Sequence, residues 1–103
     1  MPTNKFNSML GLCQKAGRLV SGELSCENEL KSRKAKLIIL AEDASDNIKK
    51  KFINSSNFYG CKVICAMNKD ELGRIIGKDM RSVIAVTDDG FAAQLEKLAD
   101  ENK

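Results

Sequence analysis

Residues 35–45 read Ala-Lys-Leu-Ile-Ile-Leu-Ala-Glu-Asp-Ala-Ser, and this stretch decides the fold. Its apolar run, residues 37–40, is too short for a helix and is typical of a strand that is covered on both faces. Glu42 and Asp43 end the run, and Ser45 can cap a following helix. The sequence therefore predicts a charged corner at the carboxyl end of a central strand, where open α/β sheets often bind ligands. The alternative is an ordinary strand-to-helix turn with two solvated carboxylates.

Helical and strand patterns alternate on both sides of this stretch. Apolar periodicity, capping residues and glycines mark five helices, and short apolar runs mark four strands. Helices are expected over residues 4–16 and 23–32, after a cap at Ser45 or Asp46, after a capping box that begins at Asn68, and after Asp88-Asp89. Strands are expected at residues 19–20, 37–41, 62–66 and 83–86. This order implies an α/β fold in which helices cover both faces of one sheet.

The apolar residues suffice for one modest core. With 103 residues, the chain is expected to form a single domain, residues 1–103. The apolar face of the first helix is expected to run from Phe6 to Ala16, and on the third helix Ile48, Phe52 and Ile53 are expected to face that core. No segment reaches the length of a membrane span, and the first residues lack the pattern of a secretion signal. A cytoplasmic location is therefore expected.

The four cysteines do not have the spacing of a metal site. Cys13, Cys26, Cys61 and Cys65 form no Cys-x-x-Cys pair, and the sequence contains no histidine. Neither a bound metal nor another cofactor is expected. Disulfides are not expected in a reducing compartment. Cys13 and Cys65 lie in apolar patterns, which predicts that both are small core residues.

The positive charge is concentrated in the first part of the chain. The net charge is +3, but residues 1–62 carry 11 basic and 6 acidic side chains, whereas residues 63–103 carry 6 and 8. The densest basic clusters are Lys31, Arg33, Lys34 and Lys36, and then Lys49-Lys50-Lys51. Such an asymmetry favours a polyanionic partner such as nucleic acid. The alternative is that these lysines and arginines only keep helix surfaces soluble.

The sequence offers little material for catalysis. It has no histidine to act as a base near neutral pH, no Gly-x-Ser-x-Gly elbow and no Gly-x-x-x-x-Gly-Lys loop. Glu42 and Asp43 are adjacent, so on a strand they would point to opposite faces. Asp88-Asp89 is better explained as a helix cap. The protein is therefore not expected to be an enzyme.

Two segments have the chemistry of an anion or base contact. Gly22 precedes the second helix, whose free N–H groups and partial positive charge suit a phosphate or a base edge. Cationic side chains from Arg33, Lys34 and Lys36 are expected to lie near this helix start. The loop over residues 77–82 combines a glycine, cations and Met80, a mixture that can clamp an unpaired RNA base. The alternative for each segment is an ordinary connection.

Four stretches together resemble the kink-turn-binding ribosomal protein family, and within it the bacterial YlxQ-like members. They are Gly22, residues 34–44, the Glu-Leu-Gly-Arg-Ile-Ile-Gly stretch over residues 71–77, and the Val-Ile-Ala stretch over residues 83–85. The resemblance covers roughly residues 5–98. It implies a three-layer α-β-α sandwich with a four-stranded mixed sheet, and a non-enzymatic, ribosome-associated protein that binds structured RNA. Family members grip a sharply bent RNA with the starts of the second and third helices and the loop before the last strand.

The family motif at the second helix is largely absent here. The family pattern is Gly-x-Asn-Glu with a lysine three residues later, and the matching positions are Gly22, Leu24, Ser25 and Asn28. Only the glycine matches. Because leucine cannot hydrogen-bond to a base edge, the resemblance implies general RNA binding more firmly than kink-turn specificity.

The other two family segments supply further candidates. Ser45 and Lys49 fall on RNA-facing positions at the third helix, and Arg81 falls on one in the loop, allowing for one inserted residue. Its alternative role is to pair with Asp79 or a helix carboxylate and fix the loop. The complete set of expected RNA-binding residues is Gly22, Ser25, Asn28, Arg33, Lys34, Ser45, Lys49, Met80 and Arg81.

The expected partner is structured, ribosomal RNA, bound by a monomer without a membrane or a small-molecule substrate. The main alternative is a protein–protein adaptor that has lost its RNA-reading residues. Leu24 favours this adaptor, because an apolar side chain suits a protein interface, whereas the basic half of the chain favours RNA. A third alternative is the accessory substrate-binding module of an enzyme.

Overall fold

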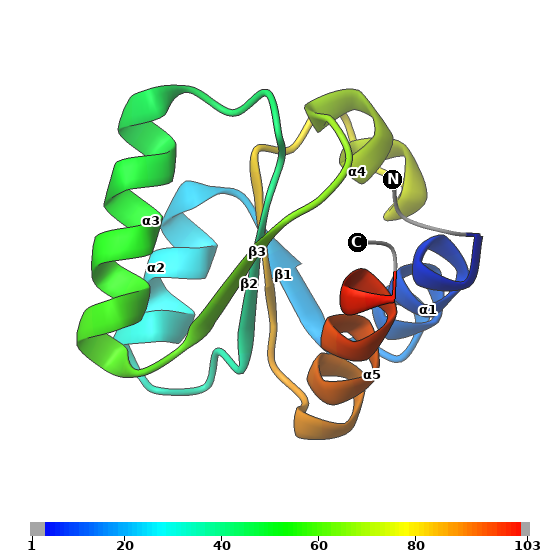
Figure 1. Cartoon of the computed structure of the whole chain (residues 1–103), viewed down its shortest axis with the longest axis horizontal. Helices are drawn as coiled ribbons and strands as arrows, with labels where there is room; N and C mark the ends of the chain where they lie inside the picture. The colour runs from blue at the N-terminus through cyan, green and yellow to red at the C-terminus, as the bar shows by residue number, and fades with distance from the viewer. Residues whose placement is uncertain (1–3, 102–103) are drawn as a thin grey trace.

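The computed structural model describes residues 4–101, in which five helices and four strands alternate along the chain (Figure 1). The helices are α1 (Asn4–Lys15), α2 (Glu23–Lys31), α3 (Asp46–Tyr59), α4 (Lys69–Ile75) and α5 (Asp89–Asp100). The strands are β1 (Leu19–Ser21), β2 (Leu37–Leu40), β3 (Lys62–Cys65) and β4 (Val83–Val86). The predicted order of elements is confirmed, and their ends differ from the prediction by one residue at several places.

The four strands form one mixed sheet in the order β1-β4-β2-β3. Strand β4 runs antiparallel to both of its neighbours, whereas β2 and β3 are parallel. In this register Val86 is paired with Leu19 of β1 and with Leu37 of β2. The expected α/β fold with a four-stranded mixed sheet is therefore confirmed.

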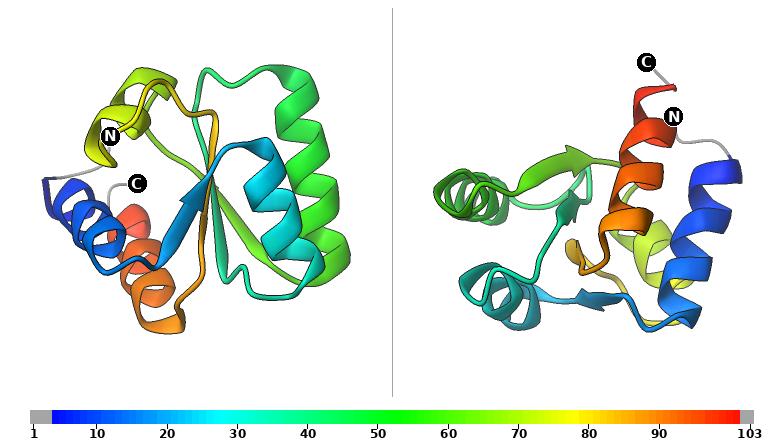
Figure 2. Two further views of the ribbon diagram at one scale, coloured as in Figure 1. Left: turned by 180° about the vertical axis from the view of Figure 1, so that it is seen from behind. Right: turned by 90° about the horizontal axis from the view of Figure 1, so that it is seen from below.

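Helices cover the sheet on both faces, which gives three layers (Figures 1 and 2). Helices α1, α4 and α5 pack on the face that Leu37, Ile39 and Ile84 present. Helices α2 and α3 pack on the opposite face, against Ile38 and Leu40. Successive residues of a strand point to opposite faces, so a run of four buried residues requires helices on both sides. All four residues of β2 are fully buried, as the apolar run predicts.

Side-chain caps begin three of the helices as the sequence predicts. The Ser45 hydroxyl accepts a hydrogen bond from the Ile48 amide at the start of α3, and the Asp88 carboxylate accepts one from Phe91 at the start of α5. Asn68 and Glu71 form a reciprocal capping box at α4. Such caps satisfy amides that have no partner within the helix, so local sequence suffices to place these helix starts.

Three core assignments from the sequence were wrong. Ile53 is 42% exposed, because Phe52 is the residue of α3 that points into the core and Ile53 lies a further 100° around the helix. Cys65 is exposed because it ends β3, an edge strand, whereas Cys13 is buried as expected. Ala16, expected to end the first helix on its apolar face, follows α1 and is exposed.

Candidate nucleic-acid interface

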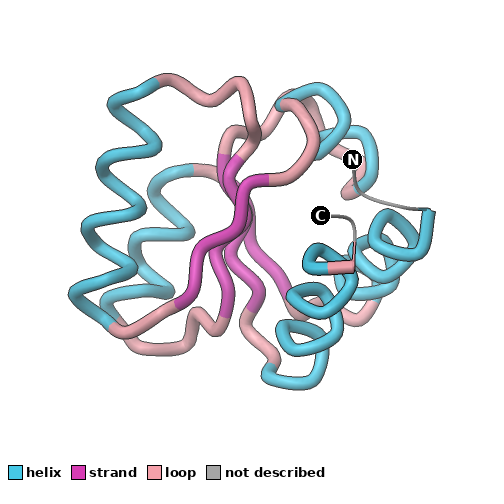
Figure 3. The backbone as a smooth tube through the Cα atoms, viewed as in Figure 1, coloured by secondary structure: helices cyan, strands magenta, loops and turns pink. Residues whose placement is uncertain are grey.

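Three chain segments meet at one end of the sandwich, the upper end in Figure 1, and their loops are seen at the top of Figure 3. They are the start of α2, the β2–α3 connection and the α4–β4 loop. The Gly22 amide donates to the Val83 carbonyl at 3.1 Å, and the Ala41 amide donates to the Ser82 carbonyl at 2.9 Å. These bonds hold both of the other segments against the end of the α4–β4 loop.

Gly22 precedes α2 with a φ of 91° and a ψ of 156°. L side chains rarely adopt this backbone conformation, so the position requires glycine. Gly22 offers no side-chain cap to the helix, and the first amides of α2 are left to an outside acceptor. This local geometry agrees with the anion-binding role predicted for the segment.

A shallow pocket of about 300 Å³ opens beside Gly22. Its lining comes from β1, the start of α2, the first turn of α3 and the α4–β4 loop. The lining residues are Ser21, Gly22, Glu23, Ile48, Met80, Arg81, Ser82 and Val83. We call these residues, together with Ser45 and Lys49, the proximal surface. The structure thus brings Gly22, Met80 and Arg81 together, although Gly22 and Arg81 are far apart in the sequence.

The Arg81 side chain is partly tied to its own loop. Its Nε donates to the Ser21 hydroxyl at 3.1 Å, and its Nη1 donates to the carbonyls of Met80 at 3.0 Å and Asp79 at 3.3 Å. The expected alternative, a pair with the Asp79 carboxylate or a helix carboxylate, is not the geometry observed. Arg81 therefore fixes the loop through carbonyl groups, and no carboxylate of the described residues pairs with it.

Ser45 and Lys49 lie at the start of α3, beside Ile48 of the pocket. Ser45 is the N-cap residue, so its hydroxyl is engaged by the Ile48 amide. The Lys49 ammonium donates to the Glu42 carbonyl at 2.7 Å, which holds the cation over the β2–α3 turn. Both residues contribute to the turn that precedes α3, and Lys49 leaves a positive charge at the proximal surface.

The acidic corner after β2 has a structural explanation. The Asp43 carboxylate accepts a hydrogen bond of 2.8 Å from the Lys69 amide at the start of α4, and the Glu42 amide donates to the Met67 carbonyl at 2.8 Å. Asp43 thereby ties the β2–α3 turn to a helix 26 residues later in the chain. The predicted corner at the strand end is present, and Asp43 there connects two segments of the proximal end.

Gly73 allows the α4–β4 loop to pack directly on α4. A Cβ atom at this position would lie 2.0 Å from the Asp79 carbonyl oxygen. The Lys78 amide donates to the Gly73 carbonyl, and the Arg81 amide donates to the Lys69 carbonyl. The backbone of α4 therefore sets the position of Met80 and Arg81.

The four remaining predicted residues lie along α2 or beyond its end. Ser25 and Asn28 are exposed on the helix, in its first and second turns. Arg33 and Lys34 follow the C-terminus of α2, so the helix separates them from Gly22. The expectation that these two residues and Lys36 lie near the helix start was wrong, because the direction of α2 carries the chain to the other end of the sheet, where the Lys36 amide bonds to Val86.

Part of the predicted basic field is neutralised within the protein. The Lys51 ammonium forms ion pairs with Glu27 and, at 3.6 Å, with Glu23 of α2. The hydrogen bond to Glu27 raises the pKa of Lys51. Of the Lys49-Lys50-Lys51 cluster, Lys51 therefore joins α3 to α2 and offsets the charge of Glu23 beside the pocket.

Sequence reasoning missed several residues of the pocket. Ser21, Ser82 and Ile48 were not expected there, and Ile48 was considered only as a core residue. The pattern of apolar residues could not predict that Ser21 lines this pocket, because only the pairing of β1 with β4 places Ser21 beside Arg81. Ile48 adds an apolar wall to the pocket while it packs on the core.

Two of the four thiols, Cys13 and Cys26, are buried. Burial raises the pKa of Cys13 to about 11 and that of Cys26 to about 12, so both remain protonated at neutral pH. Within residues 4–101, no cluster of three or more His, Cys, Asp or Glu side chains is arranged to hold a metal ion. Nor does any helix in the described part of the chain have the length and apolar character needed to cross a membrane.

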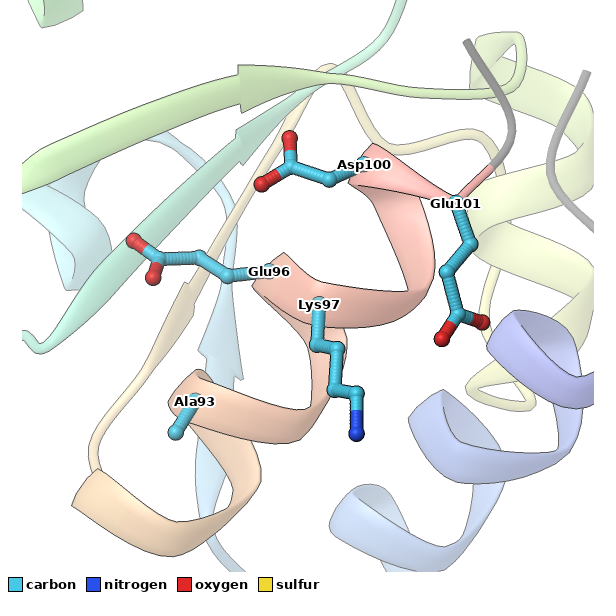
Figure 4. A pocket seen from close by; sticks show the side chains of 5 residues that line it. All are labelled: Ala93, Glu96, Lys97, Asp100 and Glu101. Carbon is cyan, nitrogen blue, oxygen red and sulfur yellow. The ribbon is translucent and has the colours of Figure 1, made fainter.

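A second pocket, of about 470 Å³, lies along α5 and has a different character (Figure 4). It is lined by Ala93, Glu96, Lys97, Asp100 and Glu101. Figure 4 shows Glu96 and Asp100 projecting from one side of α5. Three carboxylates and a single cation repel a polyanion, so this pocket does not extend the proximal surface.

The sequence is similar to two bacterial proteins named "RNA-binding protein YlxQ". The protein from Bacillus subtilis (strain 168) is 44% identical over 92 residues, which cover 89% of this chain and 92% of that protein. The protein from Enterococcus faecium is 33% identical over 96 residues, or 93% of this chain and 92% of that protein.

Solved structures share the fold. A protein of unknown function from Bacillus halodurans matches with a TM-score of 0.91 and 37% identity, over 95% of this chain and 99% of that chain. The Giardia lamblia 15.5kD RNA binding protein matches with a TM-score of 0.78 over 95% of this chain and 84% of that chain. Its identity is 17%, so this second likeness concerns the fold alone.

The family comparison covers nearly the whole described chain. Residues 4–96 match the model of the ribosomal protein L7Ae/L30e/S12e/Gadd45 family. The matched range contains all five helices except the end of α5, and it includes every segment of the proximal surface. The chain therefore belongs to the ribosomal protein L7Ae/L30e/S12e/Gadd45 family, in which it is a YlxQ-like member.

Proposed function

We propose that this protein is a non-enzymatic, cytoplasmic RNA-binding protein that associates with the ribosome and binds sharply bent, kink-turn-like RNA at the proximal surface. The observation that carries the proposal is the pocket that joins Gly22, Met80 and Arg81. The names of the two similar bacterial proteins support RNA as the ligand class.

The proximal surface has complementary chemistry for the two parts of an unpaired nucleotide. Free amides at the start of α2 and the charges of Lys49 and Arg81 suit phosphate oxygens. Met80 is 61% exposed and Leu24 is 71% exposed, and both offer apolar surface to an unstacked base. Because the Leu24 side chain cannot accept or donate a hydrogen bond, recognition depends more on the bend of the RNA than on base identity.

Salt dependence tests the phosphate contacts. With about three to five contacts, the logarithm of the affinity for a bent RNA should fall against the logarithm of the salt concentration with a slope of about −3 to −4. Fluorescence titration of the full chain with labelled RNA over a range of KCl concentrations gives this slope. A flat dependence would rule out a phosphate-dominated interface. Co-sedimentation with ribosomal subunits tests the ribosomal association.

Arg81→Ala is expected to weaken RNA binding about tenfold, because a charge-assisted contact to phosphate is lost. The free energy of unfolding should fall by only about 1 kcal/mol, since the lost hydrogen bonds are partly exposed. The measurements are an RNA titration and a urea denaturation curve of the same variant.

Ser21→Ala is the matched control for Arg81→Ala. It removes the hydroxyl that accepts from Arg81 Nε and leaves the guanidinium in place. RNA affinity should then stay within a factor of about two. Equal losses of affinity in the two variants would mean that Arg81 acts by fixing the loop and does not itself contact RNA.

The exposure of Leu24 and Met80 also supports a second candidate, a protein–protein adaptor. Apolar side chains at the centre of a surface are typical of protein interfaces. An adaptor would not bind bent RNA at low salt, and Leu24→Ala would weaken partner capture from RNase-treated extract. The titration described above therefore separates the two candidates.

A further inference from the structure

A second basic surface lies at the end of the sandwich opposite to the proximal surface. Helices α2 and α3 both end there, at the lower left of Figure 1. The Lys36 amide donates to the Val86 carbonyl, and the Thr87 amide donates to the Arg18 carbonyl, so Lys36 and Arg18 flank the end of β4. We call this the distal surface, and it consists of Arg18, Lys31, Arg33, Lys34, Lys36, Phe58 and Tyr59.

Within residues 4–101, no cation of the distal surface forms an ion pair with a carboxylate. Among the described residues, the ion pairs involve the cations Lys51, Lys62 and Arg74, none of which belongs to this surface. Three acids near this surface have other contacts, and one of them, Glu96, pairs with Lys62 at 3.8 Å. Glu29 accepts from the Ser32 hydroxyl at 3.5 Å, and Asp88 caps α5. The positive charge of the distal surface is therefore available to an external anion.

Two aromatic rings accompany these cations. The Arg33 guanidinium lies 5.4 Å from the centre of the Tyr59 ring, within the range of a cation–π contact. Phe58 is 77% exposed and meets Tyr59 edge to face, with ring centres 4.9 Å apart. Phe6 and Phe52 are fully buried, whereas Phe58 is exposed and is linked to Arg33 through the ring of Tyr59.

The backbone of Arg33 gives an independent sign of function. Its φ is 60°, in the left-handed region just after the C-terminus of α2, where glycine is usual. An arginine is disfavoured at such a position relative to glycine. The Arg33 guanidinium nevertheless lies over the Tyr59 ring, so this backbone conformation places a planar cation beside an aromatic side chain at the surface.

We propose that the distal surface binds single-stranded RNA, with the phosphates on the cations and a base stacked on Phe58. A basic track with an exposed aromatic ring is the usual chemistry for unpaired nucleotides. The cations could be explained by their favourable interaction with the helix C-termini, but this interaction does not explain why the Phe58 ring is exposed beside them. Along α2 the nearest members of the two surfaces, Glu23 and Lys31, are about 12 Å apart, and along α3 Lys49 and Phe58 are about 14 Å apart. Both distances exceed the Debye length of about 8 Å at physiological salt, so the charges of the two surfaces are largely screened from each other.

The test uses the full chain and a fluorescein-labelled octaadenylate. This single-stranded probe contains no bent duplex that the proximal surface could recognise. Phe58→Ala should weaken binding about tenfold, because base stacking on an aromatic ring is lost. Arg33→Gly should weaken it several-fold while the melting temperature stays equal or rises, because glycine suits the left-handed backbone. Leu12→Ala is the matched control, since Leu12 is an exposed apolar residue (53%) on α1, in the opposite helix layer.

Three results would overturn the proposal. The first is that octaadenylate does not bind at 50 mM salt. The second is that Phe58→Ala and Arg33→Gly both bind it with full affinity. The third is that Arg81→Ala lowers the affinity for octaadenylate as much as Phe58→Ala does. A polyglutamate peptide is the second probe. If it binds as tightly as octaadenylate, and if Phe58→Ala does not weaken its binding, the surface is a site for an acidic protein and the proposal is contradicted. A bent RNA duplex without single-stranded flanks measures binding at the proximal surface alone. Loss of octaadenylate binding with intact duplex binding would therefore contradict only the distal surface, and the opposite result would contradict only the proposed function.

Discussion

Gly73→Ala is expected to destabilise the fold although it places a better helix former inside α4. Alanine in a helix interior stabilises by about 1 kcal/mol relative to glycine. The new Cβ, however, would meet the Asp79 carbonyl oxygen at 2.0 Å, and backbone cannot move aside as a flexible side chain can. Overpacking of this kind costs about 3 kcal/mol or more, so the clash outweighs the gain. Urea denaturation should show a net loss of at least about 2 kcal/mol.

The chain contains a matched control for this substitution. Gly11 lies inside α1, and a Cβ there would meet no atom within 4 Å. Gly11→Ala should therefore stabilise the protein by about 1 kcal/mol. The same direction of change at both glycines would contradict the close packing of the loop on α4. RNA affinity provides a second measurement, because the loop that Gly73→Ala would shift carries Met80 and Arg81. The Gly73→Ala variant should bind bent RNA more weakly even well below its melting temperature.

The double variant Leu24→Asn with Ser25→Glu is expected to sharpen selectivity for a standard kink-turn. It restores the polar residue types that the family uses at these positions, and both side chains are exposed at the start of α2. A good bidentate base contact gives about 1–3 kcal/mol of discrimination in DNA readout, which corresponds to about tenfold or more in relative affinity. The measurement is a competition titration of a kink-turn against a bulged duplex of equal length.

Alanine substitutions in the same helix serve as the control for this variant. Ser25→Ala with Asn28→Ala changes exposed polar residues of α2 without adding base-reading groups, so selectivity should not increase. Strong kink-turn selectivity in the unchanged protein would contradict the idea that the missing Asn and Glu weaken base reading. Affinity for both RNAs should remain salt-dependent in every variant, because the phosphate contacts are unchanged.

The sequence alone determined the elements and the layers of this fold. The four buried residues of β2 follow directly from its uninterrupted apolar run, and the caps at Ser45, Asn68 and Asp88 follow from local hydrogen bonding. Both signals act over a few residues, so they do not depend on the path of the rest of the chain. The family resemblance came from the same stretches, and the match over residues 4–96 confirms it.

Only the tertiary structure decided which charged residues share a surface. Arg33 and Lys34 were grouped with Gly22 by their nearness in sequence, yet α2 carries them to the far end of the sheet, where they join Tyr59. Lys51 was counted with the free cations, yet the packing of α3 on α2 pairs it with Glu27. The sequence shows which residues are charged, but it does not show which opposite charge each of them pairs with in the fold.

The proximal surface depends on contacts between distant parts of the chain. Arg81 bonds to Ser21 across 60 residues, and Asp43 bonds to the Lys69 amide across 26. No local pattern encodes such pairs, because the strand order β1-β4-β2-β3 and the register of β1 on β4 set them. Hydrophobic periodicity determines which side chains are buried, whereas strand pairing and close backbone packing, as at Gly73, determine which exposed side chains meet.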